Sequence, residues 1–574
     1  MVGRYRVVDH IITQLAATGT EYFFGVDGAN IEDLFDAAFC SGGITPILAK
    51  HEFSAATMAD GYSRAVSRIG VVAATSGGGS LNLVAGLGES LASRVPVLAL
   101  VGQAPTGMDG RGSFQDTSGR SGSLDAVVLF SAVSVYCRRV TDPEDIVPAL
   151  AEALAAADSG GPAVLLLPKD IQQAMIDVVN PLESTVAVRD SVLTDPGSIA
   201  EMLRRALGPV TIIAGEQVAR DDARRELEEL RAVLRAWVAT VPDAKDVSGS
   251  PGLGQSSWLG VTGVMGHPRV VDAISRSAVC LVVGTRLSVT ARAGLDNALA
   301  GVQTVSLGAQ PPYVPATHVN STNLRASLTA LTRALTGAGR PHGLRVLDPL
   351  PHTELQPPAH EGPGIRYRDT VTLLDDLLPE GADIVVDAGN TGASTVHALP
   401  VRRAGRFVVA LGMGGMGYSF GAAIGMCFAR AKTAGPQYRT VVVAGDGSFF
   451  MHGMELHTAV QYRLPITFVL FNNNAHAMCV TREQLFYGDR YSYNRFTPAR
   501  LGAGLAAMFP GLHATDVSEL PQLAGALTEA LGRHGPSVVS VECSADEIPT
   551  FAPFLDSAAQ HTQKESSQHV AARA

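Results

Sequence analysis

The stretches TVVVAGDGSFF (residues 440–450) and ITFVLFNNN (residues 466–474) indicate how this chain folds. Each begins with an apolar, β-branched run of strand length and then reaches Gly, Asp or Asn, which are common where strands end. The residues between the two runs, 451–465, are expected to form a helix. A strand, a helix and a second strand in this order predict a βαβ unit of a parallel sheet.

An earlier part of the chain repeats this pattern. Residues 71–103 align with residues 440–472 without gaps at a constant offset of 369 (440 − 71 = 369), and RVPV (94–97) falls on RLPI (463–466). Any two βαβ units match loosely, but the shared Arg-x-Pro sequence before the second strand favours a true repeat. We therefore expect two related βαβ units.

The rest of the chain predicts an α/β fold with three doubly wound parallel-sheet domains, because β-branched runs alternate with amphipathic segments such as 144–157 and 222–237. Two polar or Pro-rich stretches, 177–198 and 341–364, are expected to be linkers. The expected domains are residues 1–176, 190–340 and 365–556, followed by a disordered tail at 557–574. The expected strands are 71–75, 97–101, 163–167, 210–214, 280–283, 384–386, 407–411, 440–444, 466–471 and 538–541.

Composition narrows the function. The 574 residues have room for three or four domains, and 46% hydrophobic with 17% charged residues indicates a globular chain. A net charge of −10 without a basic block argues against nucleic acid as a partner. The six cysteines form no C-x-x-C pair, and no stretch of 18 apolar residues lacks Gly, Pro or charge. We expect a soluble, cytoplasmic protein without a membrane segment.

The segment VVALGMGGMG (408–417) contains G-x-G-x-x-G after a predicted strand and before a predicted helix at 418–429. Taken alone it suggests a dinucleotide site, in which a helix N-terminus binds a pyrophosphate. The acidic residue expected about 20 residues later is missing around 431–435. A non-catalytic dinucleotide-binding protein therefore stays a minor alternative, and a tight turn or another cofactor is favoured.

Asp446 and Asn473 form a more specific pattern, 27 positions apart (473 − 446 = 27). Both follow buried strands, and neighbouring parallel strands end at the same edge of a sheet. A carboxylate and an amide oxygen there can share one Mg²⁺, which prefers oxygen ligands. Gly445 and Gly447 allow the backbone to approach a diphosphate, and Ser448 lies at a helix start that can bind it.

In an α/β chain, G-D-G followed by N-N at this spacing resembles the cofactor motif of thiamine-diphosphate-dependent enzymes. From Val8 to about Pro549 the chain resembles the catalytic subunit of acetolactate synthase (acetohydroxyacid synthase). The resemblance implies thiamine diphosphate and Mg²⁺ as cofactors, and pyrimidine-binding, central nucleotide-binding-like and diphosphate-binding domains in that order. It also implies a homodimer or homotetramer with its active site at the subunit interface. The segments that carry it are 51–64, 75–82, 101–103, 114–116, 167–170, 445–448, 472–474 and 478–487.

The resemblance also assigns roles. Glu52 would be the catalytic carboxylate facing N1′ of the aminopyrimidine, Met416 would hold that ring folded over the thiazolium, and the Gly414 carbonyl would accept from N4′. Asp446, Asn473 and Ala475 would bind the metal. The other implied cofactor contacts are Thr75, Asn82, Asn390, Thr391, Gly445, Gly447, Ser448, His476, Ala477 and Met478, although Asn390 and Thr391 also suit ordinary helix capping.

The family reaction is decarboxylation of a pyruvate-like 2-oxo acid and carboligation of the resulting enamine to a second carbonyl acceptor. Ala29, beside Gly28 in the first loop, occupies the position where simple decarboxylases have a protonating residue, so carboligation is favoured. Gln115 would lie near the reacting atoms. Two residues depart from the family pattern: Asp27 replaces a glycine, and Arg482 stands near the position where acetolactate synthases have a Trp that shapes the acceptor pocket. The alternative is a decarboxylase of a sulfo- or phosphono-substituted pyruvate.

The central part of the chain adds one further expectation. GTR (284–286) resembles an FAD-binding stretch, whereas LGAQ (307–310) lacks the acid expected there. The resemblance therefore permits FAD as an additional cofactor without requiring it.

Overall fold

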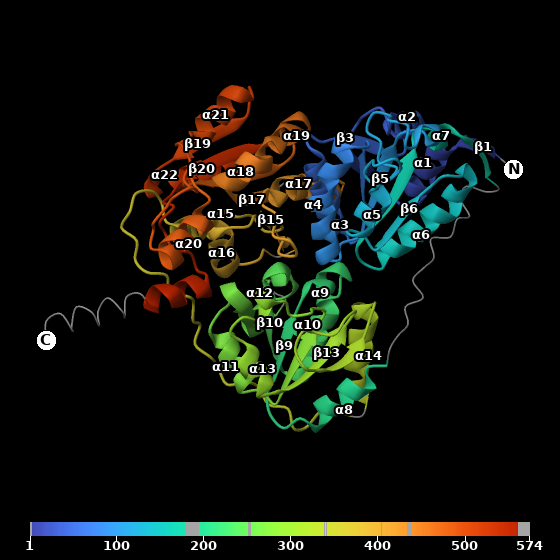
Figure 1. Ribbon diagram of the computed structural model, residues 1–574. Coiled ribbons are helices and arrows are strands. Elements are labelled where there is room, and N and C mark those ends of the chain that lie inside the picture. The colour runs from blue at the N-terminus through green and yellow to red at the C-terminus, as the bar shows by residue number, and fades with distance from the viewer. Residues whose placement is uncertain are drawn as a thin grey trace. The chain divides into compact units, whose positions relative to one another are not determined.

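The computed structural model describes residues 3–178, 195–250, 254–337, 339, 341–402, 404–432, 435 and 438–560. Contacts divide the chain into two units. The first contains Met1–Asp190, Ala410–Gly435 and Met451–Ile466, and the second contains Ser191–Val409, Pro436–Phe450 and Thr467–Ala574. Most of the linker expected at 177–198 lies outside the described residues. The elements of both units are labelled in Figure 1.

The first unit is built on a six-stranded parallel sheet in the order β3-β2-β4-β5-β7-β6. A short antiparallel pair, β1 (Gly3–Arg6) and β8 (Met175–Val178), accompanies it. The strands are β2 (Tyr22–Val26), β3 (Thr45–Leu48), β4 (Gly70–Ala74), β5 (Val97–Gln103), β6 (Tyr136–Arg139) and β7 (Pro162–Pro168). The helices are α1 (Val7–Ala17), α2 (Glu32–Ser41), α3 (Glu52–Val66), α4 (Gly78–Ala92), α5 (Ala126–Ser131), α6 (Ile146–Asp158), α7 (Lys169–Gln173), α17 (Tyr418–Arg430) and α19 (Leu456–Gln461), with 3-10 turns η1 (Thr106–Met108), η2 (Pro143–Asp145) and η6 (Gly453–Glu455).

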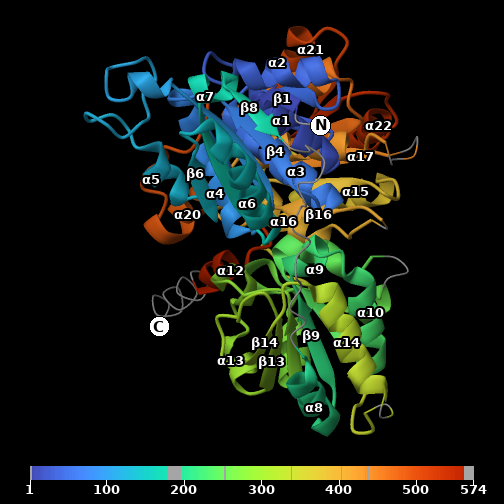
Figure 2. The same cartoon turned by 90° about the vertical axis from the view of Figure 1, so that its right-hand side faces the viewer.

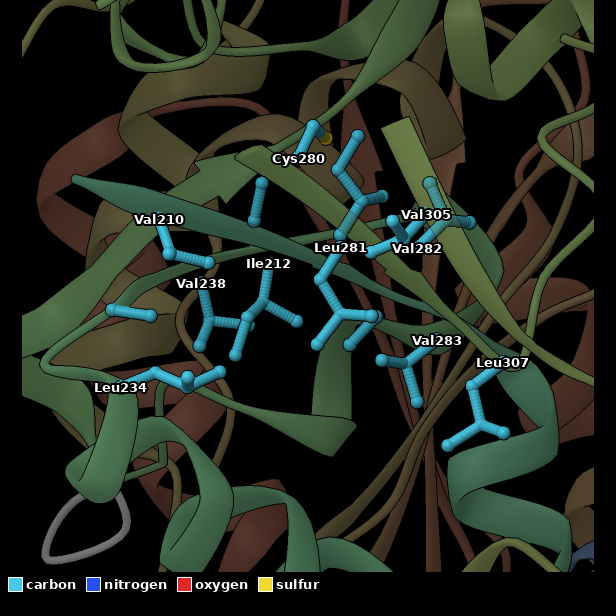
Figure 3. Packing of buried hydrophobic residues seen from close by; sticks show 14 of the residues in the cluster. Val210, Ile212, Leu234, Val238, Cys280, Leu281, Val282, Val283, Val305 and Leu307 are labelled. Carbon is cyan, nitrogen blue, oxygen red and sulfur yellow. The ribbon is translucent and has the colours of Figure 1, made fainter. Parts of the chain in front are cut away.

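The central sheet belongs to the second unit and has the order β11-β10-β9-β12-β13-β14. Helices α10 and α14 lie on one side of it and α13 on the other, as expected for a doubly wound fold (Figure 2). Side chains of β9, β10, β12 and β13 fill its core (Figure 3). Its elements are β9 (Val210–Ala214), β10 (Trp237–Thr240), β11 (Trp258–Val261), β12 (Val279–Val283), β13 (Gln303–Gly308), β14 (Thr317–Asn320), α8 (Gly197–Arg205), α9 (Glu216–Arg220), α10 (Arg224–Leu234), α11 (Arg269–Ser275), α12 (Val289–Arg292), α13 (Asp296–Ala300), α14 (Leu324–Gly337), η3 (Pro242–Val247), η4 (Gln255–Ser257) and η5 (Gly263–Met265).

The third sheet, also in the second unit, has the order β16-β15-β17-β18-β20-β19. Helices α15 and α22 pack together, and α22 contacts β20. The elements are β15 (Asp383–Val386), β16 (Phe407–Val409), β17 (Thr440–Gly445), β18 (Ile466–Asn472), β19 (His513–Val517), β20 (Ser537–Glu542), α15 (Tyr367–Leu377), α16 (Asn390–Ala398), α18 (Asp446–His452), α20 (Ala477–Tyr487), α21 (Leu501–Met508) and α22 (Leu520–Leu531).

The first and third sheets have the same topology. When the six strands of each sheet are numbered in chain order, both sheets read 2-1-3-4-6-5, whereas the central sheet reads 3-2-1-4-5-6. The turn before the second strand of the aligned units is also alike, because Arg94 (φ 57°) and Arg463 (φ 50°) are both left-handed. The expected relation between the two βαβ units is therefore confirmed at the level of topology, and so is the prediction of three α/β sheets.

The segment expected to be the second linker, 341–364, contains no helix and no strand longer than a single bridge. It is nevertheless attached to the central part of the chain, because Leu344, Leu347 and Leu350 are buried in the core of the central sheet. At the other end of the chain, residues 552–560 are helical, and 561–574 of the expected tail lie outside the described residues. Among the helices that the structure describes, none has the length and apolar character needed to cross a bilayer.

Helices α3 and α17 pack closely against each other in the first unit, although they are far apart in sequence. Glycines bring their backbones together: a Cβ atom added to Gly61 would lie 2.1 Å from the Ala422 oxygen. One added to Gly425 would lie 1.9 Å from the Met58 oxygen. The helix that follows the glycine-rich loop at 412–417 is thereby fixed against the helix that begins with Glu52.

Candidate functional site

Predicted cofactor residues collect at the switch point of the third sheet. Strands β16 and β17 lie on opposite sides of β15, so the order of the strands reverses there. Ligands of α/β sheets bind beyond the carboxyl ends of the strands at such a switch point. Asn390 and Thr391 open α16 after β15, Gly445 ends β17, and Asp446 begins α18. The sequence interpretation therefore placed these residues at the edge where the fold permits a ligand.

Asp446 is the most unusual of these residues. Its side chain is completely buried, and neither carboxylate oxygen accepts a hydrogen bond of ordinary geometry from a described residue. Burial raises the pKa of Asp446 to about 7, although the nearby main-chain N–H groups of Gly447, Asn473, Asn474 and Ala475 lower it. A buried oxygen pair without a donor is costly unless a cation occupies the site. This carboxylate fits a divalent metal ligand.

The residues around Asp446 are held in place by buried hydrogen bonds. Ser448 Oγ donates to Asp387 Oδ1 at 2.6 Å. Asn390 Nδ2 donates to Thr481 Oγ1 at 3.0 Å, while Asn390 Oδ1 is buried without a partner among the described residues. A Cβ atom on Gly445 would have Thr391 Oγ1 as its nearest neighbour at 3.8 Å, so the backbone there is open to close approach. The arrangement offers hydroxyl, amide and main-chain groups to a diphosphate.

The turn after β18 places Asn473 beside this carboxylate. Asn473 Oδ1 accepts from the Ala475 N–H at 3.1 Å, and its Nδ2 donates to the Tyr367 hydroxyl at 3.3 Å. The turn depends on Asn474, which has φ 53°, a conformation that Asn adopts more readily than most residues. Because Nδ2 is bound to Tyr367, the amide oxygen of Asn473 is the atom that faces the turn.

The start of α20 follows this turn directly. His476 stands at the N-cap position of this helix, its N–H donates to the Asn494 oxygen at 2.9 Å, and its ring lies edge-on against Phe496 with centroids 4.7 Å apart. Ala477 is buried and Met478 is half-buried. Arg482 is exposed on the same helix, with its guanidinium 5.3 Å from the centre of the Phe486 ring.

In the first unit, Glu52 is the first residue of α3. His51 caps this helix by accepting from the Phe53 N–H at 3.1 Å. The Glu52 carboxylate is buried, and its Oε2 accepts from Asn82 Nδ2 at 2.9 Å. A Cβ atom added to Gly79 would lie 3.0 Å from Glu52 Oε1. The structure thus brings together Glu52 and Asn82, two residues that the resemblance assigned to one site.

The loops after β2 and β4 meet at the switch point of the first sheet. A Cβ atom added to Gly28 would lie 2.8 Å from the Thr75 side chain, and the Asn30 N–H donates to Thr75 Oγ1 at 3.3 Å. Asp27 and Ala29 flank Gly28 and are exposed, and Asp27 Oδ1 accepts from the Gly28 N–H at 2.7 Å. The exposed side chains that this part of the chain places at the strand end are therefore the carboxylate of Asp27 and the methyl group of Ala29.

Gln115 reaches the same strand end from the loop that follows β5. It has φ 59°, and its Oε1 accepts from Ser76 Oγ at 3.1 Å. Ser76 Oγ in turn accepts from Asn30 Nδ2 at 2.7 Å, and Gly77 leaves room for the Gln115 side chain. The chain of hydrogen bonds fixes the Gln115 amide beside the end of β4.

One residue of this region was missed by the sequence interpretation. Glu89, on α4, is 3% exposed, and its carboxylate accepts from the N–H groups of Gly412, Met413 and Gly414. The amide groups with which a G-x-G-x-x-G loop would bind a pyrophosphate therefore have a protein carboxylate as their partner. The available signal was a single charged residue in the otherwise apolar and small segment AGLGESLA (85–92).

The central sheet has its own switch point between β9 and β12. A Cβ atom added to Gly284 would lie 2.7 Å from Leu324, and one added to Gly215 would lie 2.2 Å from Thr285. Gln217 Oε1 accepts a hydrogen bond from the Ala309 N–H at 2.8 Å. The Cβ positions of these glycines are thus filled by protein atoms, and FAD binding stays a prediction from which no catalytic step is derived.

Comparison with known proteins agrees with the residue pattern. Residues 5–122 match the model "Thiamine pyrophosphate enzyme, N-terminal TPP binding domain", residues 197–335 match the central-domain model, and residues 387–541 match the C-terminal TPP binding domain model. The two TPP-binding matches support thiamine diphosphate as the cofactor.

Similar proteins match over nearly the whole chain. The acetolactate synthase isozyme 2 large subunit of Escherichia coli (strain K12) is 28% identical over 96% of this chain and 98% of that protein. The acetolactate synthase large subunit of Porphyra purpurea is 25% identical over 96% and 94%, respectively. The probable acetolactate synthase large subunit of Methanocaldococcus jannaschii is 27% identical over 95% and 93%.

A solved structure has the same fold. Benzoylformate decarboxylase from Polynucleobacter necessarius superposes with a TM-score of 0.80, covering 95% of this chain and 99% of the other, at 19% identity. The three family models follow one another along the chain in the order of the three sheets, and the relatives match nearly the whole chain. Both findings lead to one conclusion. The chain belongs to the thiamine pyrophosphate enzymes, and its relatives among them include acetolactate synthase large subunits.

Proposed function

We propose that this protein uses thiamine diphosphate and Mg²⁺ to decarboxylate a pyruvate-like 2-oxo acid and to join the remaining acyl unit to a second carbonyl compound. The observation that carries the proposal is the buried Asp446 carboxylate at the switch point of the third sheet, whose oxygens accept no hydrogen bond of ordinary geometry from a described residue. The near full-length relatives with acetolactate synthase names support the reaction type.

Residues of the third sheet would hold the metal and the diphosphate. Asp446, Asn473 and the main-chain oxygen of Ala475 supply oxygen ligands of the kind that Mg²⁺ prefers. The hydroxyl of Ser448 and the main chain at Gly447 would face the diphosphate, because the start of a helix presents free N–H groups. The other residues with this role are Asn390, Thr391, Gly445, His476, Ala477 and Met478.

Residues of the first unit would control the proton of the aminopyrimidine ring. Bound thiamine diphosphate supplies a nucleophilic carbon and an electron sink for the loss of CO₂. Glu52 would exchange a proton with N1′ of that ring, and Asn82 keeps the Glu52 carboxylate oriented. Met416 would support the ring from below, and the Gly414 carbonyl would accept from its amino group.

The choice between carboligation and simple decarboxylation depends on proton donors at the first loop. Ala29 offers only a methyl group, and the Gln115 amide is oriented by Ser76. A pocket with these groups protects the acyl unit from protonation, which favours transfer to a second carbonyl compound. The exposed Asp27 favours the alternative, a decarboxylase of a sulfo- or phosphono-substituted pyruvate, because it could act as the proton donor.

Product analysis separates these reactions. The purified protein is incubated with thiamine diphosphate, Mg²⁺ and pyruvate, with and without a second 2-oxo acid or an aldehyde. Carboligation predicts a hydroxy-ketone or acetohydroxy acid, whose yield rises with the acceptor. Free aldehyde as the sole product would contradict carboligation. Turnover restricted to sulfo- or phosphono-pyruvate, with free aldehyde as product, would establish the alternative.

The Glu52→Gln variant tests the proposed activation of the cofactor. Gln keeps the size of the side chain but loses the exchangeable proton, so kcat should fall by at least about 100-fold, the range for loss of a general acid–base group. Binding of thiamine diphosphate, measured by its Mg²⁺-dependent effect on thermal stability, should change much less. Turnover equal to that of the parent would refute the role of Glu52, and retention of NAD without any effect of thiamine diphosphate would favour a dinucleotide-binding protein.

We also propose that the chain forms at least a homodimer, as the resemblance implies. Static light scattering of the purified protein measures this directly. A mass of one chain at all concentrations at which the enzyme is active would contradict the proposal.

A further inference from the structure

The carboxylate of Glu89 binds three consecutive main-chain N–H groups in the glycine-rich loop that precedes α17. Its Oε1 accepts from Gly412 at 3.1 Å, and its Oε2 accepts from Met413 at 2.6 Å and from Gly414 at 3.3 Å. Ser93, the C-cap residue of α4, donates its Oγ–H to Oε1 at 2.6 Å. Successive N–H groups that converge on one anion form a fixed positive concavity, and the loop conformation is therefore coupled to this one carboxylate.

The charges around Glu89 strengthen this coupling. Asp60 and Glu89 are both buried, and the guanidinium of Arg64 lies between them, at 2.7 Å from Asp60 and 4.0 Å from Glu89. Ser90 and the Tyr418 hydroxyl also donate to Asp60. Arg64 is thus closer to Asp60 than to Glu89, and the close hydrogen bonds to the Glu89 carboxylate come from the three loop N–H groups and from Ser93. Such bonds are strong, since hydrogen bonds to an ionised acceptor are stronger than neutral ones.

The other side of the loop is open. A Cβ atom added to Gly414 would meet no atom within 4 Å, and Met413 is 68% exposed. Gly414 has φ 67° and Gly417 has φ 87°, conformations that a glycine adopts without strain. The loop is thus anchored by its N–H groups on the side of α4, and it presents Gly414 and the half-buried Met416 on a face that the first unit leaves uncovered.

We propose that Glu89 is a positioning residue, which fixes the loop at 412–416 so that the Gly414 carbonyl and the Met416 side chain are set for the aminopyrimidine ring. The inference rests on the proposed function, because it assigns the loop its contact with thiamine diphosphate. It also explains the G-x-G-x-x-G pattern: these glycines allow the loop to wrap around a carboxylate of the protein itself.

The test uses the full-length Glu89→Gln variant. Gln has one acceptor oxygen and no charge, and its amide group would face N–H donors, so at least one loop hydrogen bond is lost. We expect kcat to fall by about 10- to 100-fold, which corresponds to the loss of a charge-assisted hydrogen bond, with KM for the 2-oxo acid changed by less than about 3-fold. Without any cofactor, the amides of 412–416 should exchange hydrogen for deuterium at least about 10-fold faster.

The matched control is Asp60→Asn. It removes a buried charge from the same cluster but touches none of the three loop N–H groups, so it should lower thermal stability without faster exchange at 412–414. The conservative variant Glu89→Asp keeps the charge and should recover part of the lost kcat. If Glu89→Gln does not fold, Ser93→Ala decides the question, because it removes one donor to Oε1 and should shift exchange and kcat in the same direction by a smaller amount.

The outcomes separate the inference from the proposed function. Parent-like exchange and kcat in Glu89→Gln, together with an inactive Glu52→Gln, would overturn the positioning role alone. Parent-like activity in both variants would overturn the proposed function as well. Faster exchange in Asp60→Asn equal to that in Glu89→Gln would show a general loosening of the cluster and would also overturn the inference.

Discussion

At the scale of single residues, the candidate site combines groups that folding alone does not favour. Asp446 is completely buried without a donor of ordinary geometry among the described residues, and burial raises its pKa to about 7. Asn390 also keeps a buried amide oxygen without a partner among the described residues. Such groups destabilise an empty fold, and proteins retain them where a ligand completes their bonding.

The Asp446→Asn variant should therefore separate stability from ligand binding. Without ligand at pH 8, above the raised pKa, the variant should be more stable than the parent by on the order of 1–3 kcal/mol, because a buried charge without a donor is removed. Thiamine diphosphate with Mg²⁺ should raise the melting temperature of the parent and leave that of the variant unchanged, and a chelator should abolish the rise in the parent. Differential scanning calorimetry measures both effects.

Asp383→Asn is the matched control for this prediction. Asp383 is equally buried, but it lies at the opposite end of β15 and accepts from the Arg406 N–H at 2.7 Å and from the Tyr438 hydroxyl at 2.7 Å. This control should lose stability and keep the ligand-induced rise. An Asp446→Asn protein that still responds to Mg²⁺ and thiamine diphosphate would exclude Asp446 as the metal ligand.

At the scale of elements, close backbone approach fixes α17 against α3. Added Cβ atoms at Gly61, Gly421 and Gly425 would lie within 2.1 Å of atoms of the facing helix. Because the loop at 412–417 leads directly into α17, the position of this helix also determines the position of Met416. Glycine in these helices is thus required by packing, although it weakens a helix by itself.

The Gly425→Ala variant should therefore destabilise the first unit. The new methyl group would lie 1.9 Å from the Met58 oxygen, a backbone atom that has no room to move, and overpacking of this kind costs about 1–3 kcal/mol or more. The control Gly504→Ala, on α21, meets no atom within 4 Å and should gain up to about 1 kcal/mol from helix propensity. Urea unfolding followed by circular dichroism measures both; equal effects of the two substitutions would contradict the packing argument.

The sequence predicted elements well where hydrophobic pattern and turn residues agree. The strand expected at 210–214 is β9, and the one expected at 466–471 is β18 with one more residue. The strand expected at 407–411 ends at Val409, and the N–H groups of Gly412 and Gly414, which follow, donate to Glu89. The contact between Glu89 and this loop spans more than 300 residues, and a pattern read locally contains no information about such a pairing.

At the scale of the whole molecule, one topology carries two different sets of candidate residues. The first and third sheets share their strand order, but the aligned positions have diverged: Gly445, Asp446 and Gly447 stand where the first sheet has Ser76, Gly77 and Gly78 by the offset of 369. The sequence alignment predicted this relation, since the strands and the Arg-x-Pro turn are short-range features. The central sheet has another order and carries no residue of the candidate site.

The central sheet is nevertheless joined to the third sheet by a buried lysine. Lys245, on η3, is completely buried, and its Nζ donates to the main-chain oxygens of Val396 at 2.6 Å and Leu399 at 2.5 Å, at the end of α16. Asp246, next in sequence, binds Arg406. The other end of α16 begins with Asn390, so this contact connects the central sheet to a helix of the candidate site.

Lys245→Met should reveal this contact through pH. Burial lowers the pKa of Lys245 to about 7, opposed by Asp375, whereas the unfolded chain keeps the ordinary value of 10.5. Between about pH 7 and pH 10 the unfolded state holds a proton that the folded state lacks, so the parent gains stability with rising pH, by up to about 1.4 kcal/mol per unit. Met has no such proton, so the free energy of unfolding of the parent should rise relative to that of the variant between pH 7 and pH 10.

His267 and His397, which lie beside Lys245, titrate below this window because burial lowers the pKa of both. Urea unfolding at pH 7, 8 and 9 measures the difference, and Lys432→Met, at an exposed lysine, should show none. Parallel stability curves for the parent and Lys245→Met would mean that the amine keeps its proton in the folded state over this pH window, which would contradict the lowered pKa.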